Sequence, residues 1–306
     1  MEGRKVRVGL AYALVVLVWS TTPFGIKLSN SSLSFVAAIS VRAVLALIVC
    51  SLILTVLRQP LIKHRNDWSA FLAGALGMFP NMLLVYWSAQ YIPSGLTAVI
   101  FGLYPFMVGV FSLLILKENI FNMRRIIAMT IAVTGLVIIN ISQISLGGNA
   151  VLGLVGMVAS TAFFGLSSVW LKHVGGGVDP LRQTTGMLLL VAPIYVLFWF
   201  FLDGEFPVAV DDRSLVGVIY LVLAGSVLGG TLFFYVLKNC SVASVGLITF
   251  ITPIIALTIG VVFDDETFTI VTVIGSLLVI FSLAIYQNIP RHAVLLYRRQ
   301  ALARVL

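Results

Sequence analysis

Long apolar stretches recur along the whole chain, and each is long enough to cross a lipid bilayer as a helix. A membrane-spanning helix needs about 20 mostly apolar residues, and 60% of the 306 residues are hydrophobic while only 10% are charged. Because hydrocarbon offers no hydrogen-bond partners, the backbone must pair within itself, which predicts an all-α integral membrane protein. Ten transmembrane helices are expected, at about residues 6–28, 33–57, 67–89, 94–116, 124–143, 151–172, 180–202, 214–238, 242–263 and 269–288.

Little chain remains outside these predicted spans for any chemistry. The longest gap, at about residues 203–213, is too short to hold a catalytic domain. The chain has neither a G-x-x-x-x-G-K-[ST] phosphate loop nor an H-E-x-x-H zinc motif. Its two cysteines, Cys50 and Cys240, are predicted near cytoplasmic helix ends, where no disulfide framework or thiolate metal site is expected. We therefore expect no enzyme, no catalytic residue, no cofactor and no metal.

The positions of Lys and Arg predict the orientation of the chain, because loops on the cytoplasmic side carry an excess of both. With the spans taken in order, all of the 19 basic residues fall on one side except Lys27, Arg42 and Arg213. Both termini are thus predicted to be cytoplasmic. The opposite side holds Asp203, Glu205, Asp211, Asp212, Asp264, Asp265 and Glu266. The net charge of +8 reflects this asymmetry, so nucleic acid is not an expected partner.

The two ends of the chain bear on its contact with lipid. The stretch "MEGRKVR" and the apolar run after it mimic a signal peptide, but the run is too long and lacks a small-residue cleavage site. This apolar run is therefore predicted to be the first membrane span. The tail at 291–306 is basic and partly amphipathic, so it either lies along the inner lipid surface or is a solvated tail. Membrane lipids are therefore expected partners, and a homodimer stays open as an assembly.

The chain also repeats itself. When residues 91–118 are set above 239–266, Pro105 meets Pro253 and Glu118 meets Glu266, both at an offset of 148 residues. Each half holds five predicted spans, an odd number, so the second half must enter the membrane in the opposite direction. We therefore predict two inverted five-helix repeats, at residues 1–144 and 145–290, followed by the tail at 291–306. Such repeats are typical of alternating-access transporters.

A family resemblance joins these features. The first span contains "WSTTPFGIK" (19–27), the second carries Arg42, and the fourth and ninth share a proline and a terminal glutamate. In this order, the chain resembles the drug/metabolite transporter (DMT) superfamily, and within it the ten-helix EamA-type exporters, over about residues 6–288. The resemblance implies export of small metabolites, often amino acids, through a central cavity lined by spans 1–4 and 6–9, with spans 5 and 10 at the periphery. Pro23 departs from the common pattern of the first span.

Candidate substrate contacts lie near mid-membrane in four of the spans. Aromatic walls with a few hydroxyl groups suit a small amphipathic ligand. The alternative is that the hydroxyls bond their own helix carbonyls while the aromatic rings fill the core. The candidates of this type are Trp19, Ser20, Thr22, Phe101, Tyr104, Phe164, Ser167, Thr249 and Thr252.

Two strongly polar residues are further candidates. Asn81 follows Pro80, which frees a carbonyl one turn back, so its amide either bonds that carbonyl or faces the substrate. Arg42 is the only charge well inside a predicted span, and it either clamps a substrate carboxylate or is structural. Since no intramembrane acid is available to pair Arg42, helix-end carbonyls are its expected internal partners.

The prolines and the missing acids bear on mechanism. Pro105 and Pro253 are predicted to break their helices near mid-membrane, as a hinge or as a static kink. No Asp or Glu lies deep in a predicted span, which favours facilitated movement or exchange over proton coupling. The leading hypothesis is an exporter of amino acids or related compounds that works by alternating access. A broad-specificity drug or cation exporter, or less favourably a passive channel, is the alternative.

Overall fold

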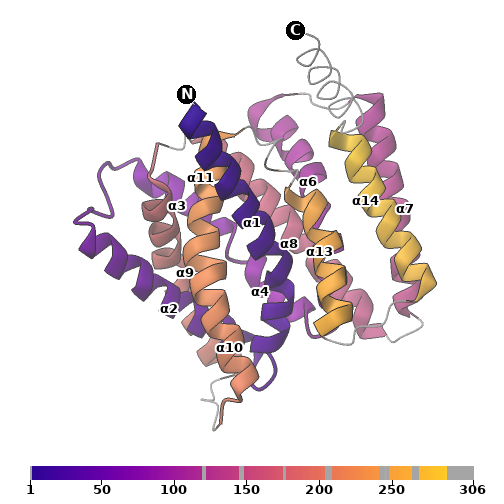
Figure 1. The fold of residues 1–306 in the computed structure, drawn as a ribbon, viewed down its shortest axis with the longest axis horizontal. Coiled ribbons are helices and arrows are strands. Elements are labelled where there is room, and N and C mark those ends of the chain that lie inside the picture. The colour runs from indigo at the N-terminus through magenta and orange to yellow at the C-terminus, as the bar shows by residue number, and fades with distance from the viewer. Residues whose placement is uncertain are drawn as a thin grey trace.

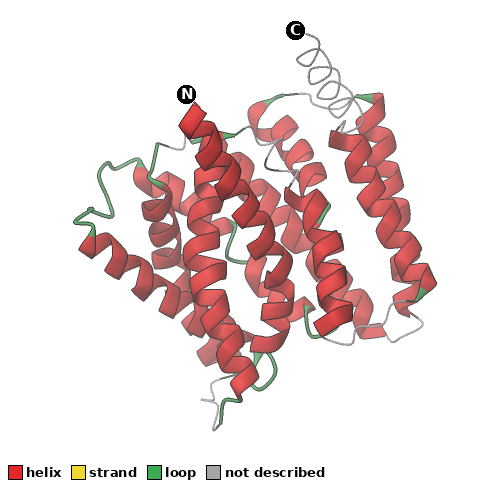
Figure 2. Ribbon diagram, in the orientation of Figure 1, coloured by secondary structure: helices red, strands yellow, loops and turns green. Residues whose placement is uncertain are grey.

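The computed structural model describes residues 2–118, 122–144, 148–174, 177–203, 209–240, 245, 248–263 and 269–287. Within these residues the chain is helical and contains no strand (Figure 2). The first half comprises α1 (Glu2–Ser29), α2 (Phe35–Val56), α3 (Asp67–Leu76), α4 (Asn81–Ser88), α5 (Ser94–Phe101), α6 (Tyr104–Phe111), the π-helical η1 (Ser112–Leu116) and α7 (Met123–Ile144). The second half comprises α8 (Gly148–His173), α9 (Pro180–Leu202), α10 (Asp212–Tyr220), the π-helical η2 (Leu221–Gly229), α11 (Gly230–Asn239), α13 (Ile248–Phe263) and α14 (Ile270–Gln287).

Seven helical stretches of the described chain are long and apolar enough to cross a membrane. They are Val6–Ser29, Phe35–Val56, Asp67–Ser88, Ser94–Leu116, Asn149–His173, Pro180–Leu202 and Asp212–Asn239. Two shorter apolar helices are Ile251–Phe263 and Ile270–Tyr286. The prediction of an all-helical integral membrane protein is thus confirmed, whereas the count of ten spans, their inverted arrangement and the side of the termini stay predictions. Glu266 and the tail at 291–306 lie outside the described residues.

The outer surface of the bundle is largely apolar, and its interior holds strongly polar residues as well as apolar ones. Large side chains such as Leu52, Leu197 and Phe200 are exposed, whereas Asn81 and Arg42 are buried. A water-soluble protein exposes mostly polar side chains, and a lipid-facing perimeter accounts for the many large apolar side chains exposed here. The polar groups are therefore directed at neighbouring helices or at an internal cavity.

Two of the predicted spans are interrupted in the middle. The span at 67–89 consists of α3 and α4, separated by the turn Gly77–Pro80, and the span at 94–116 is interrupted at Gly102–Leu103 between α5 and α6. Pro105 lies in the first turn of α6, where its missing N–H costs no helical hydrogen bond. The helix break predicted near Pro105 is therefore found just before it.

The helix break predicted near Pro253 is not found. Pro253 lies inside α13, which continues from Ile248 to Phe263 without interruption. A proline removes only one helical hydrogen bond, and membrane helices tolerate that loss when neighbouring helices support them. The two matched prolines thus occupy different local structures.

The helices pack side by side around α1 and α8. Helix α2 packs on α9, α4 and α6 pack on α8, and α1 contacts α5, α10, α11 and α13. Helices α7 and α14 pack along each other at one edge of the bundle (Figure 1). Their close approach depends on small residues, because a Cβ atom on Gly135 would lie 2.7 Å from the backbone oxygen of Gly275. This edge position leaves the remaining helices to enclose the interior.

Candidate functional site

An internal cavity of about 120 Å³ lies between helices of both halves. Its wall is formed by α1, α2, the α3–α4 pair with the turn between them, α5, α8, α9, η2, α11 and α13. Among the sequence-predicted site residues, those that line it are Trp19, Thr22, Arg42, Phe101, Phe164, Ser167 and Thr252. Ser20, Asn81, Tyr104 and Thr249 are not part of the wall. The sequence-predicted residues are therefore brought together only in part.

Five aromatic side chains pack together at this wall, and we call them the aromatic cluster: Trp19, Phe101, Tyr104, Phe164 and Phe233. The ring of Trp19 lies 5.5 Å from that of Phe164 and 4.9 Å from that of Phe233, between centroids. Tyr104 is fully buried behind Phe164, at a ring distance of 5.1 Å. Tilted and edge-to-face pairs of this kind hold each ring in one orientation. The cluster therefore provides a rigid apolar surface built from α1, α5, α6, α8 and α11.

Arg42 is the only charged residue of the cavity wall within the described chain. It is 4% exposed, and its Nε donates a hydrogen bond to Ser226 Oγ at 2.8 Å. One terminal N–H group donates to Tyr86 Oη at 3.3 Å, and the guanidinium carbon lies 5.9 Å from the centre of the same ring. A guanidinium has five N–H donors. Most of its donor capacity therefore remains available at the cavity.

The partners of Arg42 correct the sequence-based expectation. Helix-end carbonyls were the expected internal partners, but the side-chain hydroxyls of Tyr86 and Ser226 take that role. Ser226 lies in η2, and π-helical segments often occur at functional sites because they rotate side chains out of the α-helical register. Space for the guanidinium comes from Gly225, where a Cβ atom would lie 3.1 Å from Arg42 Nη2. No sequence pattern marks the π-helical segment, so this pairing was missed.

The hydroxyl groups of the wall are mostly bound to backbone carbonyls. Thr22 Oγ1 donates to Val18 O at 2.7 Å within α1, and Ser167 Oγ donates across to Ala73 O of α3 at 2.6 Å. Ser20, which faces away from the cavity, donates to Val16 O at 2.7 Å. The first and last bonds follow the predicted alternative in which hydroxyls bond their own helix. Each hydroxyl oxygen can still accept a hydrogen bond from a ligand where it borders the cavity.

Asn81 forms a link across the α3–α4 interruption. Its side chain is fully buried, Nδ2 donates to Gly77 O at 2.6 Å, and Oδ1 accepts from Ser160 Oγ at 2.5 Å. Gly77 begins the turn that ends at Pro80, so the side chain of Asn81 bonds the carbonyl oxygen on the far side of the interruption. Of the two roles predicted for Asn81, the geometry favours the internal partner.

A methionine wall was missed by sequence reasoning. Met78, Met82, Met157 and Met187 all border the cavity. Methionine is unbranched and polarizable, so it adapts to ligands of different shape. Single methionines in apolar spans carry no periodic signal, and only the packing of the α3–α4 turn, α4, α8 and α9 brings these together. The cavity thus combines a rigid aromatic side, an adaptable side and one cation.

The sequence profile of the EamA-like transporter family matches residues 7–141 and again residues 151–286. A protein of Bacillus subtilis (strain 168), named as the uncharacterized transporter YvbV, is 24% identical over 289 residues, which cover 92% of each chain. The inner membrane transporter YedA of Escherichia coli (strain K12), also named as uncharacterized, is 26% identical over 267 residues, covering 85% of this chain and 83% of that one. The protein PecM of Dickeya dadantii (strain 3937) is 25% identical over 223 residues, or 72% and 74% of the two chains.

One crystal structure of another protein is similar in fold. It superposes with a TM-score of 0.66 over 93% of this chain and 99% of its own, at 16% sequence identity. Identity this low supports a shared helical fold and says nothing of a shared ligand.

Proposed function

The chain belongs to the EamA-like transporter family, and from this premise we propose that it exports small amphipathic metabolites that carry a carboxylate, with amino acids as the first candidates. The single observation that carries the proposal is Arg42, the one charged group that the described chain places in a cavity wall of apolar and hydroxyl side chains. A guanidinium inside a membrane protein is costly to bury, so a partner of opposite charge is expected in at least one state.

The donors of Arg42 fit a carboxylate. Two of its five N–H donors are used by the hydroxyls of Ser226 and Tyr86 within the described chain. Neither partner is charged, so the positive charge of the guanidinium is not neutralised by them. A carboxylate accepts two parallel N–H bonds from a guanidinium, and this charge-assisted pair is among the strongest polar contacts in proteins.

The rest of the cavity suits the organic part of such a metabolite. Both the aromatic cluster and the methionine wall offer apolar surface. The aromatic surface is rigid, whereas the methionine side chains adapt to the shape of a ligand. The volume of about 120 Å³ is well below the roughly 300–1,000 Å³ of pockets that hold drug-sized ligands. Both observations support a small metabolite over a bulky drug.

Alternating access is the proposed mechanism. Two successive matches to one family profile support an internal duplication, and interrupted helices near the cavity are a common feature of transporters built from repeats. The interruptions at Gly77–Pro80 and Gly102–Leu103 supply places where the halves can rearrange. Facilitated movement or exchange is proposed because the described cavity wall holds no Asp or Glu to carry a proton.

A cation exporter is the second candidate, and the aromatic cluster is the observation that favours it. Faces of Trp and Phe attract organic cations, which is how aromatic cages hold quaternary ammonium groups. The positive charge of Arg42 repels a cation bound in the same cavity, so export of a carboxylate is the better supported of the two functions.

Uptake by proteoliposomes tests the proposal. The purified protein would be reconstituted and assayed with labelled amino acids, their uncharged amides and quaternary ammonium compounds, with and without a pH gradient. We expect saturable uptake and counterflow of one or more amino acids and no uptake of their amides. Uptake of the ammonium compounds alone would support the second candidate, and unsaturable flux without counterflow would indicate a channel.

A further inference from the structure

A second pocket of about 160 Å³ lies beside the central cavity, toward the end of the bundle that carries the basic loops. It is lined by the end of α8, the start of α9 and the last turns of α11, through Leu171, Lys172, Val178, Gln183, Phe234, Leu237 and Lys238. We call it the vestibule. The positive-inside prediction assigns this end to the cytoplasm, which is where an exporter takes up its substrate.

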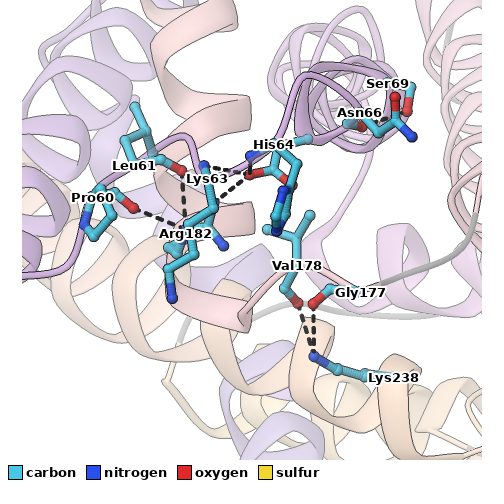
Figure 3. A network of polar contacts seen from close by, with 11 residues as sticks. Pro60, Leu61, Lys63, His64, Asn66, Ser69, Gly177, Val178, Arg182 and Lys238 are labelled. Carbon is cyan, nitrogen blue, oxygen red and sulfur yellow. Dashed lines mark hydrogen bonds and ion pairs between the residues drawn. The ribbon is translucent and has the colours of Figure 1, made fainter.

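The two lysines of the vestibule are held by carbonyl oxygens. Lys172 Nζ donates to Leu237 O and Cys240 O, both at 3.1 Å. Lys238 Nζ donates to Gly177 O and Val178 O, both at 3.2 Å, as Figure 3 shows. An ammonium has three N–H donors, so each lysine keeps one, and neither meets a carboxylate within the described chain. These bonds also tie the ends of α8, α9 and α11 together, which accounts for the lysines structurally, while no carboxylate of the described chain neutralises them.

Gln183 adds an unsatisfied acceptor to the same wall. Its side chain is 3% exposed, and Nε2 donates to Ala70 O at 2.7 Å. Its Oε1 is buried and has no hydrogen-bond partner in the described part of the chain. Leaving a buried carbonyl oxygen unpaired is costly, so a donor that arrives from a ligand would be favourable. The vestibule thus presents two cations and one acceptor, the complement of a zwitterionic amino acid.

A buried ion pair at the neighbouring residue holds the segment that carries Gln183 in place. Arg182, the preceding residue, forms a salt bridge with Asp67, and its Nε donates to Pro60 O and Leu61 O at 3.0 Å (Figure 3). These contacts fix the first turn of α9 against the loop between α2 and α3. The acceptor of Gln183 is therefore carried by a rigid segment, as a binding group requires.

Phe234 separates the vestibule from the central cavity. It is the only residue that borders both spaces among those that the structure describes. Its neighbour Phe233 borders the central cavity alone. The tip of the Phe234 ring points at α3, since a Cβ atom on Gly74 would lie 3.5 Å from Phe234 Cζ. The side chain of Phe234 therefore lies between the two spaces.

We propose that the vestibule is a first binding site for the exported carboxylate, formed by Lys172, Lys238 and Gln183, and that Phe234 is the gate between it and the cavity of Arg42. The proposal rests on the proposed function for the identity of its ligand. In it, the substrate carboxylate binds the two ammonium groups, the substrate amine donates to Gln183 Oε1, and the ligand passes to Arg42 when Phe234 turns aside.

The charge of the vestibule can be tested without any transport assay. A full-length variant lacking native thiols (Cys50→Ala, Cys240→Ser) would carry one reporter, Val178→Cys, whose backbone carbonyl contact with Lys238 is kept. The reporter is then labelled with two methanethiosulfonates, one bearing a sulfonate and one a quaternary ammonium, in inside-out and right-side-out vesicles. We expect reaction from the cytoplasmic side and an excess of the anionic over the cationic rate of about tenfold or more, since clefts of one charge raise local concentrations of counter-ions by 10-fold and above.

The lysine variants decide whether that preference comes from the vestibule. Lys172→Gln with Lys238→Gln should abolish the preference for the sulfonate. The matched control is Lys63→Gln, a basic side chain of the same end that is exposed and outside the vestibule, and it should leave the preference unchanged. A preference that survives the double substitution, or that Lys63→Gln removes equally, would overturn the anion site.

The gate is tested with a deeper reporter. Met187→Cys borders the central cavity and not the vestibule, so we expect slow labelling from the cytoplasmic side. Phe234→Ala should raise that rate, whereas Tyr235→Ala, a truncation one residue away at a side chain that borders neither space, should not. Equal effects of both, or no effect of Phe234→Ala in a variant that still elutes as a single folded species, would exclude the gate. If the anion preference and the gate are found but no carboxylate is transported in proteoliposomes, the proposed function fails while the vestibule stands.

Discussion

Arg42 of α2 and Ser226 of η2 are joined by a hydrogen bond of 2.8 Å in the interior of the bundle, where both side chains are at most 4% exposed. The bond connects residues from the two halves of the chain that match the family profile separately. A neutral hydroxyl holds the guanidinium in place without neutralising it. The arrangement therefore orients Arg42 while leaving its charge for another partner.

Replacing Arg42 should remove carboxylate transport. For Arg42→Ala we expect transport of an amino-acid substrate to fall by about 10- to 150-fold, since hydrogen bonds to charged groups contribute about 1.5–3 kcal/mol and 1.4 kcal/mol is a factor of ten. Arg42→Lys keeps the charge but cannot form two parallel bonds, so it should recover transport only in part. Initial rates of uptake in proteoliposomes, as a function of substrate concentration, measure both.

Folding must be checked for these variants, because removing Arg42 also leaves Ser226 and Tyr86 without their partner. Melting temperatures from tryptophan fluorescence and the elution profile in detergent serve as the control. Carboxylate transport at the native level by stably folded Arg42→Ala protein would contradict the clamp role.

Ser226→Ala tests whether the hydroxyl positions Arg42. We expect a several-fold increase in KM with little change in the maximal rate, because the guanidinium remains but is less restrained; a lost hydrogen bond to a charged group is worth about 1.5–3 kcal/mol at most. Ser226→Thr keeps the hydroxyl and should retain most of the native KM. A fall in the maximal rate with unchanged KM would indicate that Ser226 serves the conformational change and not the position of Arg42.

Much of the fold follows from the sequence because hydrocarbon imposes one strict condition, that every backbone group be paired within its segment. Apolar length alone therefore predicts α2 and α9 with nearly correct bounds. Within a span, the sequence does not show which side chains border the cavity. Ser20 and Thr22 are both small polar residues of α1, and both bond carbonyls of their own helix, yet only Thr22 borders the cavity.

Arg42 was predictable as a site residue because a charge in an apolar run stands out regardless of structure. Its partners were not, since Ser226 and Tyr86 are ordinary residues that meet Arg42 only through the packing of α2, α4 and η2. Similarly, nothing in the residues around Pro253 distinguishes it from Pro105, although α13 continues through the former and the helix is interrupted before the latter.

Gly186→Ala should destabilise the contact between α3 and α9. A Cβ atom there would lie 2.3 Å from Phe71 Cδ1, and Phe71 is fully buried, so its ring has no free space to move into. Overpacking of this kind costs about 1–3 kcal/mol. The melting temperature in detergent should fall. Gly9→Ala is the matched control, because nothing lies within 4 Å of its added Cβ and alanine favours a helix more than glycine does, so it should not lower the melting temperature. Equal stability of both variants would show that α3 and α9 can separate slightly at no cost.

Breaking the buried ion pair between Arg182 and Asp67 should destabilise the protein more than removing it whole. The two side chains are 4% and 8% exposed. Losing one partner of such a pair costs about 3–5 kcal/mol, because the other charge stays buried. We therefore expect Arg182→Met to lower stability strongly, and the double variant with Asp67→Leu to lose less than the sum of the single losses. The double-mutant cycle is measured by thermal or detergent-induced unfolding, and strictly additive losses would show that the pair is uncoupled.

Asp211 should make stability depend on pH at the other end of the bundle. Its pKa lies well below the ordinary value, chiefly because Ser31 Oγ donates to Oδ2 at 2.6 Å, and further because the N–H of Ser214 donates to Oδ1 at 2.7 Å. A carboxyl group with a lower pKa in the folded state binds fewer protons there than in the unfolded chain. Its contribution is therefore fully present above the unfolded pKa of about 3.9 and is lost as pH falls through the folded value.

The variant Asp211→Asn isolates this effect, since asparagine also caps helix N-termini and keeps an acceptor for the start of α10 while removing the charge. We expect the native protein to have the higher melting temperature by a constant margin above about pH 5, and the margin to shrink below about pH 4. Asp212→Asn serves as the comparison, because this neighbouring carboxylate accepts none of the hydrogen bonds from Ser31, Ser32 or Ser214. Its variant should retain the loss of stability below about pH 4 that Asp211 produces. A margin for Asp211→Asn that does not change with pH would show that the advantage of Asp211 does not depend on its charge, and any pH dependence of stability would then have to come from other groups.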